Sequence, residues 1–172
     1  MASDSGVHPA ITVRPATEAD IPRILEIERE SEGAGHFAEA DYQQAMASNP
    51  NANTAQARRI VLIAEAAGVA CGFLVARFLY EEWEIENIAV AKPARRAGFG
   101  ESLVSAFLQS HACSKSGLER AQAPVKSVFL EVRESNLAAR NLYEKSGFAI
   151  AGRRQAYRNP EENAILYRYS FQ

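Results

Sequence analysis

The chain has 172 residues and a formal net charge of −2, and its two cysteines, Cys71 and Cys113, stand far apart. This length predicts one domain that folds without disulfide or metal cross-links, and the cysteine spacing indicates neither a disulfide framework nor a zinc site. The charge argues against a nucleic-acid-binding protein, and the lack of a signal peptide or of an apolar run near about 18 residues predicts a cytoplasmic protein that contacts no membrane.

After a flexible tail at 1–10, the hydrophobic periodicity predicts a single domain over 11–172. Runs of β-branched and aromatic residues predict strands at 11–14, 59–66, 69–80, 83–90, 127–132, 149–154 and 164–171. Apolar residues at helical spacing predict helices that begin at Thr17, at Glu39, near Gly100 and at Ser135-Asn136. Polar segments at 48–57 and 118–126 are expected to be loops. This order of elements predicts an α/β domain in which helices cover both faces of a mixed sheet of about seven strands.

The stretch 84–109 combines a strand, a glycine-containing turn and an amphipathic helix. The turn, Arg95-Arg96-Ala97-Gly98-Phe99-Gly100, leaves little side chain over the opening of the helix. Backbone N–H groups at a helix N-terminus have no intrahelical partner and attract anions, so the turn and its arginines are interpreted as a pyrophosphate site. A Walker A loop is excluded because Glu101 follows Gly100, and a dinucleotide fingerprint is excluded because Leu103 replaces its third glycine. An ordinary turn with solvated arginines remains the alternative.

Two blocks of sequence resemble a known family. Arg95-x-x-Gly98-x-Gly100 resembles the acetyl-CoA motif of the GNAT N-acetyltransferases. The block 129–148, F-L-E-V-R-E-S-N-L-A-A-R-N-L-Y-E-K-S-G-F, together with N-I-A-V at 87–90, is similar to the ribosomal-protein-alanine N-acetyltransferases (RimI type). The resemblance implies a GNAT-type fold with a mostly antiparallel sheet, acetyl-CoA as co-substrate and no metal. It implies a protein N-terminus as acceptor, such as that of ribosomal protein S18. The chain departs from this subgroup at Gly35-His36-Phe37-Ala38, at Ala156 and at Asn163, which would line the acceptor side.

The resemblance also implies which residues hold the cofactor. The pyrophosphate is expected on the amides and side chains of Arg95, Arg96, Ala97, Gly98, Phe99, Gly100, Glu101 and Ser102. The pantetheine arm is expected along the backbone of Ile88, Ala89 and Val90, with the Val90 N–H donating to the thioester carbonyl. Asn136 is expected to cap a helix and to contact the cofactor, which Tyr143 also meets.

Glu131, in a strand flanked by apolar residues, is the leading candidate for the base that takes the amine proton. Two alternatives stay open: Glu131 pairs with an arginine such as Arg133, or Glu86 on the cofactor strand is the base. Tyr143 is the expected acid, because a phenol is protonated at neutral pH and can donate to the leaving thiolate. Simple packing is the alternative for a helical tyrosine. The sequence predicts an enzyme, with a small-molecule amine as alternative acceptor and a non-catalytic acyl-CoA sensor as a further alternative.

Overall fold

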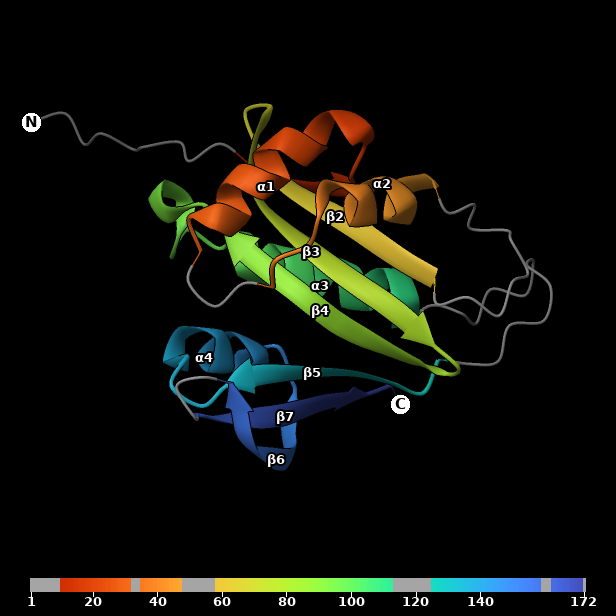
Figure 1. Ribbon diagram of the computed structural model, residues 1–172, viewed down its shortest axis with the longest axis vertical. Coiled ribbons are helices and arrows are strands. Elements are labelled where there is room, and N and C mark those ends of the chain that lie inside the picture. The colour runs from red at the N-terminus through yellow and green to blue at the C-terminus, as the bar shows by residue number, and fades with distance from the viewer. Residues whose placement is uncertain (1–9, 32–34, 48–57, 113–124, 159–161, 172) are drawn as a thin grey trace, which may run out of the picture.

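The described residues form one seven-stranded sheet with the strand order β1-β2-β3-β4-β5-β7-β6 (Figure 1). This computed structural model describes residues 10–31, 35–47, 58–112, 125–158 and 162–171. The strands are β1 (Ile11–Pro15), β2 (Arg58–Ala66), β3 (Val69–Leu79), β4 (Glu82–Val90), β5 (Ser127–Arg133), β6 (Ala149–Arg158) and β7 (Glu162–Ser170). The helices are α1 (Ile21–Arg29), α2 (Glu39–Ala47), α3 (Phe99–Ala112) and α4 (Leu137–Lys145), with 3-10 turns η1 (Glu18–Asp20) and η2 (Lys92–Ala94).

The predicted α/β class, the mostly antiparallel sheet and the order of elements are confirmed. The helix predicted to begin at Thr17 starts as η1, and α1 itself begins at Ile21 with Pro22 in its first turn, where a missing N–H costs no helical hydrogen bond. The predicted tail, apart from Ala10, the loop at 48–57 and most of the loop at 118–126 lie outside the described residues. Within the described part of the chain, no helix combines the length and the apolar composition that crossing a bilayer requires.

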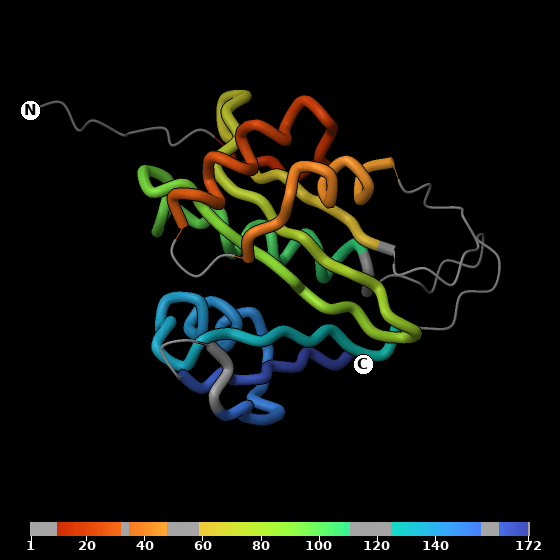
Figure 2. Tube along the Cα trace, viewed as in Figure 1, coloured from red at the N-terminus to blue at the C-terminus, as the bar shows by residue number. Residues whose placement is uncertain are grey.

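One pair of neighbouring strands differs from the rest of the sheet. Every other described pair is antiparallel, whereas β4 and β5 run parallel. Their ladder contains three residue pairs, the last joining Glu84 to Phe129. Beyond this point the two strands diverge, as Figures 1 and 2 show. The edge of β4 that faces β5 therefore has no strand partner over its second half, where its backbone groups are available to other partners.

A β-bulge lies in β4 where the divergence begins. Across β3, Val75 faces Asn87 and Ala76 faces Ile85, so Glu86 is an extra residue without a ladder partner on β3. A bulge bends a strand and increases its twist, which accounts for the turning of β4 away from β5. It also places the side chains of Glu86 and Asn87 on the same face, because Glu86 meets Arg59 of β2 and Asn87 meets Glu28 of α1.

The two faces of the sheet are covered by different helices (Figure 1). Helices α1 and α2 lie on one face, where the buried side chains of Ile24, Ile27 and Tyr42 pack against strand residues such as Phe73. Helix α3 lies on the other face, and its apolar stripe packs against the strand residues whose side chains point to that face, such as Leu74 and Ile85. That stripe consists of Leu103, Val104, Phe107 and Leu108, the residues whose helical spacing the sequence displays. Tyr143 of α4 belongs to the same core as α3.

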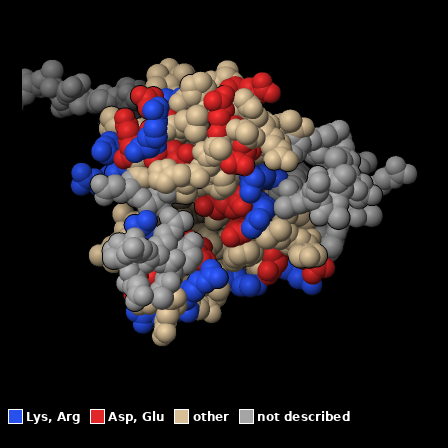
Figure 3. Space-filling view, viewed as in Figure 1, with Lys and Arg blue, Asp and Glu red and all other residues tan. Residues whose placement is uncertain are grey.

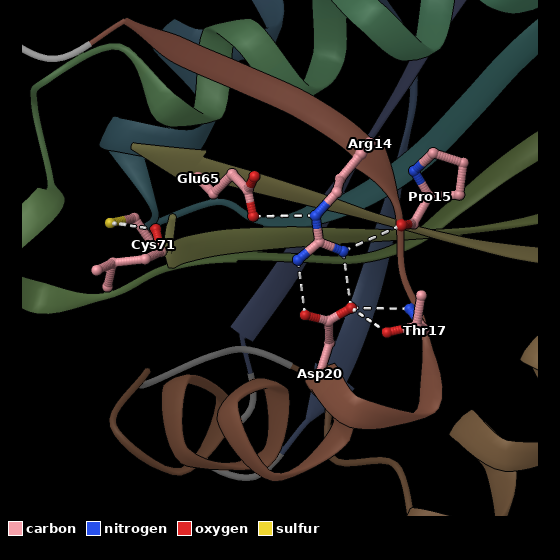
Figure 4. Close-up of polar contacts among 7 residues, drawn as sticks. Arg14, Pro15, Thr17, Asp20, Glu65 and Cys71 are labelled. Carbon is pink, nitrogen blue, oxygen red and sulfur yellow. Dashed lines mark hydrogen bonds and ion pairs between the residues drawn. The ribbon is translucent and has the colours of Figure 1, made fainter. Parts of the chain in front are cut away.

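A network of charged and polar groups anchors the beginning of α1 to the sheet (Figure 4). The guanidinium of Arg14 on β1 donates to both carboxylate oxygens of Asp20, at 2.8 and 2.9 Å, and to Glu65 of β2 at 2.9 Å. The Thr17 N–H and hydroxyl also donate to Asp20, at 2.8 and 3.0 Å. The hydrogen bonds from Arg14, opposed by burial, lower the pKa of Asp20 to about 2.

Candidate active site

The divergence of β4 and β5 opens a cleft of about 110 Å³ between them. Residues from both strands and from the beginning of α4 line it: Gly35, Ile85, Glu86, Asn87, Ile88, Glu131, Val132, Arg133, Asn136, Ala139 and Tyr143. The fold thus brings Ile88, Asn136 and both residues expected to be catalytic, Glu131 and Tyr143, to one place. The alternative base, Glu86, lies there as well.

The backbone of β4 presents Val90 to this open edge. The Ala91 N–H donates to the Cys71 carbonyl on the β3 side at 2.8 Å. Because the polar groups of successive strand residues point in opposite directions, those of Val90 point away from β3. Arg95 Nε accordingly donates to the Val90 carbonyl at 3.1 Å. The Val90 N–H therefore faces the side where β5 has separated from β4. The side chain of the preceding residue, Ala89, is buried under α1.

The turn before α3 has an unusual backbone. Arg96 and Gly98 both have positive φ, at 63° and 94°, which is ordinary for glycine and uncommon for arginine. The Ser102 N–H donates to the Gly98 carbonyl at 2.9 Å, which is the first α-helical hydrogen bond. The N–H groups of Phe99, Gly100 and Glu101 precede it and have no partner within the helix. The turn therefore presents consecutive donors at the positive end of the helix dipole, a suitable arrangement for an anion.

The side chains of this turn contribute unequally. Phe99 is 7% exposed and packs in the core beneath α3, so only its backbone can meet a ligand. The Arg95 guanidinium is bound within the protein, because it also donates to Ser31 Oγ at 3.3 Å. The side chains of Arg96, Ala97 and Glu101 are exposed. Arg96 is consequently better placed than Arg95 to meet an anion with its side chain.

The two candidate bases have different surroundings. Glu86 accepts two hydrogen bonds from Arg59, at 2.6 and 3.0 Å, and lies 3.1 Å from Arg77 Nε. Figure 3 shows acidic and basic side chains gathered over β3 and β4 on this face. Glu131 meets Arg154 of β6 at 3.2 Å, and both side chains are more accessible, at 26% and 64% exposure. The arginine beside Glu131 is thus Arg154 rather than Arg133. Glu86 is thus held by two arginines, at 2.6 and 3.1 Å, whereas Glu131 meets one arginine at 3.2 Å.

Tyr143 enters the cleft from α4. Asn136 begins that helix, and its side-chain oxygen accepts the Ala139 N–H at 3.2 Å, as the sequence predicts for a cap. Tyr143 is 4% exposed and packs beside the rings of Phe148 and Tyr167. Burial raises the pKa of Tyr143 well above the ordinary value of a phenol, so its hydroxyl stays protonated at neutral pH.

Two polar contacts at the cleft were missed by sequence reasoning. Asn87 binds Gly35, and Arg154 meets Glu131, and each contact joins residues that are far apart in the sequence. The sequence shows Asn87 as an amide within a predicted strand. It does not show that this amide is buried, because the bulge that turns Asn87 to the buried face has no sequence marker. The described residues contain no group of three His, Cys, Asp or Glu side chains that could hold a metal ion.

Comparisons with known proteins agree with this fold. Residues 21–148 match the family described as the acetyltransferase (GNAT) family. The crystal structure of the ribosomal-protein-S18-alanine N-acetyltransferase from Escherichia coli is similar, with 25% identity, 95% of each chain covered and a TM-score of 0.72. Ard1 from Thermoplasma volcanium is 26% identical over 95% of this chain and 99% of its own, with a TM-score of 0.74. Arabidopsis thaliana NAA60 with a bisubstrate analogue shares the fold at 18% identity over 94% of this chain and 98% of its own, with a TM-score of 0.73. A comparison with curated protein sequences finds no match.

Proposed function

Because the chain belongs to the acetyltransferase (GNAT) family, we propose that it acetylates the α-amino group of a protein N-terminus, with the N-terminal alanine of ribosomal protein S18 as the expected acceptor. The family makes the chain an acetyl-CoA-dependent N-acetyltransferase. The observation that carries the proposal is the cleft that collects Glu131, Tyr143 and the open edge of β4. The similarity to an S18-alanine N-acetyltransferase and to Ard1, at 25% and 26% identity, supports the choice of acceptor.

The residues around the cleft fit acetyl-CoA in two ways. The consecutive N–H groups of Phe99, Gly100 and Glu101, with the exposed side chain of Arg96, suit a pyrophosphate. The free edge of β4 over Ile88 to Val90 suits an extended arm that hydrogen-bonds as an added strand would. Bound acetyl-CoA supplies a thioester whose carbonyl carbon the amine attacks. The Val90 N–H then donates to the carbonyl oxygen on which negative charge develops.

Glu131 is the proposed base. It lies on the β5 side of the cleft, and its one described ion-pair partner, Arg154, is mostly exposed, so the carboxylate can accept a proton from the incoming ammonium. Glu86 is less suited, because its carboxylate already forms ion pairs with Arg59 and Arg77. An α-amine has a pKa of about 8, so a weak base suffices to generate the neutral nucleophile at physiological pH.

Tyr143 is the proposed acid. As the carbon–sulfur bond breaks, the sulfur keeps the bonding electron pair and the Tyr143 hydroxyl gives it a proton. The nitrogen loses its second proton to solvent as the amide forms, and the phenolate regains one from solvent, so the protons balance. Burial keeps the hydroxyl protonated beforehand.

The test is an assay for free CoA thiol with the purified protein. We expect release with a peptide that begins Ala-Arg-Tyr and none with the same peptide carrying an N-acetyl group. Mass spectrometry should place the acetyl group on the α-amine rather than on a lysine. Turnover restricted to small amines, such as polyamines, would contradict the peptide acceptor, and acetyl-CoA binding without any turnover would identify a sensor.

A further inference from the structure

A buried carboxylate that the proposed mechanism does not use lies next to the cleft. Glu28 on α1 is 2% exposed. Its Oε1 accepts hydrogen bonds from the Tyr42 hydroxyl at 2.8 Å, from Asn87 Nδ2 at 2.9 Å and from the Phe37 N–H at 3.3 Å. Burial raises the pKa of Glu28, and the three donors oppose that shift. Burying a carboxylate costs free energy unless it is hydrogen-bonded. The three hydrogen bonds offset this cost, so Glu28 fixes the positions of the groups that donate them.

Asn87 connects Glu28 to the wall of the cleft. Its Nδ2 also donates to the Gly35 carbonyl at 3.0 Å, and its Oδ1 accepts the Gly35 N–H at 3.1 Å. One side-chain amide thus satisfies both backbone groups of Gly35, and both residues line the cleft. The bulge at Glu86 is what turns Asn87 toward α1 and makes this pairing possible.

Phe37 is held from two further directions. Its ring lies 5.8 Å from the Tyr42 ring, edge to face, and the Arg59 guanidinium lies 5.4 Å from its centroid. Arg59 in turn binds Glu86 of the cleft. The backbone of Gly35 and Phe37 is therefore hydrogen-bonded to α1 and β4. The aromatic ring of Phe37 contacts Tyr42 of α2 and Arg59 of β2.

We propose that Glu28 is a positioning residue for the acceptor: through Asn87 and the Phe37 N–H it holds the Gly35–Phe37 segment in place, and with it Gly35 as a preformed part of the cleft wall. This inference rests on the proposed function, since it assumes that the acceptor occupies the cleft. A preformed wall removes the conformational entropy that the segment would otherwise lose on binding. Loosening it raises the KM for the acceptor. The acetyl-CoA contacts at Val90 and at the turn before α3 do not depend on it.

The experiment compares two substitutions of one residue. Glu28→Gln keeps an oxygen that can accept all three hydrogen bonds, whereas Glu28→Leu leaves the donors of Tyr42, Asn87 and Phe37 without that acceptor. We expect Glu28→Leu to raise the acceptor KM at least tenfold, with kcat and the calorimetric Kd for acetyl-CoA within about twofold of wild type. Glu28→Gln should stay within about threefold for all three constants. Ile24→Ala, a core truncation on the same helix, is the matched control and should lower the Tm without raising the KM.

A second readout does not depend on turnover. The Gly35 and Phe37 amides should exchange with deuterium at least tenfold faster in Glu28→Leu than in Glu28→Gln or Ile24→Ala. If Glu28→Leu does not fold, Asn87→Ala applies the same tests, because it releases Gly35 directly. An unchanged acceptor KM in the folded variant, or an equal rise in Glu28→Gln, overturns the inference. If the wild-type protein uses a small amine instead of a peptide, the proposed function fails alone, and the same comparison on that amine still decides the role of Glu28.

Discussion

At Tyr143, burial keeps available the proton that the reaction requires. The side chain is 4% exposed, so water is kept from the hydroxyl, and the raised pKa keeps the proton in place at neutral pH. The thiolate that departs beside the hydroxyl is the group that takes this proton. The packing around the ring comes from aromatic groups that do not require the hydroxyl, which allows the oxygen to be removed while the ring stays in place.

We therefore expect Tyr143→Phe to lower kcat by about 10²-fold or more, the usual effect of removing a positioned acid. The Kd for acetyl-CoA should change little, because the hydroxyl is required chiefly when the thiolate leaves. Stopped-flow or steady-state thiol release, with calorimetry for binding, checks both quantities. Tyr167→Phe is the control for loss of a neighbouring buried hydroxyl. An unchanged kcat would reduce Tyr143 to a packing role.

Glu131 and Glu86 are distinguished by pH. Glu131→Gln keeps the shape and removes the proton acceptor, so kcat/KM at neutral pH should fall by about 10-fold or more. Raising the pH toward 9 should recover part of the loss, because more of the α-amine, with a pKa of about 8, arrives neutral. Glu86→Gln should lower kcat/KM less, since the Glu86 carboxylate already forms ion pairs with Arg59 and Arg77. A pH-dependent recovery seen in Glu86→Gln alone would assign the base to β4.

At the scale of elements, the two glycines of the turn before α3 have different roles. Gly98 has a φ of 94°, and a Cβ there would meet Ile11 at an ordinary 3.6 Å, so its constraint is the backbone conformation. A Cβ on Gly100 would lie 3.2 Å from Leu142 Cδ2 of α4, so its constraint is the close approach of α3 and α4. The first glycine shapes the donors of the turn and the second sets the distance between two helices.

Gly98→Val should accordingly weaken acetyl-CoA binding at least tenfold, about 1.4 kcal/mol, in a protein that still folds. Gly100→Val should mainly lower the Tm, and adding Leu142→Ala should recover part of that loss by making room. Gly68→Ala is the control for backbone strain alone. Gly68 also has positive φ, but it lies in the turn between β2 and β3, and no atom would lie within 4 Å of the added carbon. Calorimetry and thermal unfolding measure these effects. Unchanged acetyl-CoA affinity in Gly98→Val would place the cofactor elsewhere.

The junction of β1, η1 and β2 predicts a pH-dependent stability. The pKa of Asp20 is lowered to about 2 in the folded protein, so its contribution is present above about pH 4 and is lost as the pH falls toward 2. Because Arg14 is 38% exposed, we take the contribution as about 1–2 kcal/mol rather than the full value that the pKa difference implies. Urea unfolding of Asp20→Asn should show this deficit at pH 7 and a smaller one near pH 3. The control is Glu26→Gln, which removes an exposed ion pair with Arg23 and should change the free energy of unfolding little. A deficit in Asp20→Asn that does not vary with pH would contradict the assignment.

At the scale of the whole molecule, β4 and β5 join two parts that carry different halves of the site. Strands β1–β4 carry the Val90 edge, and β5 with α4 carries Glu131 and Tyr143. Where β4 and β5 meet, Glu82 of β4 accepts hydrogen bonds from Ser127 of β5 at 2.6 Å and from Arg168 of β7 at 2.5 Å. This contact adds to the short ladder in setting the width of the cleft.

Glu82→Ala should therefore lower the stability by about 1–2 kcal/mol and raise the KM values for acetyl-CoA and acceptor together, because both lie across the junction. Glu81→Ala is the neighbouring control: its ion pair with Lys126 is mostly exposed and should matter little. Two-substrate kinetics with thermal unfolding would test this. A change confined to one substrate would show that the junction does not set the width of the cleft.

Much of this architecture is present in local sequence patterns. The apolar stripe of α3, the cap at Asn136, the glycine after α4 and the runs of β-branched and aromatic residues in β2 and β3 each depend on residues a few positions apart, so their elements are predicted correctly. The turn before α3 is visible for the same reason, since its glycines and the helix that follows are contiguous.

The sequence by itself thus determined the class of the fold, the order of its elements and the two blocks that resemble one enzyme family. Only the tertiary structure decided that β4 and β5 part after three residue pairs, that Arg154 meets Glu131, and that Glu86 is held by two arginines while Asn87 holds Gly35. Periodicity and capping are local energies, which a short window of residues contains. Strand divergence, the bulge at Glu86 and ion pairing depend on which distant side chains the packed sheet brings together, and no short window contains that information.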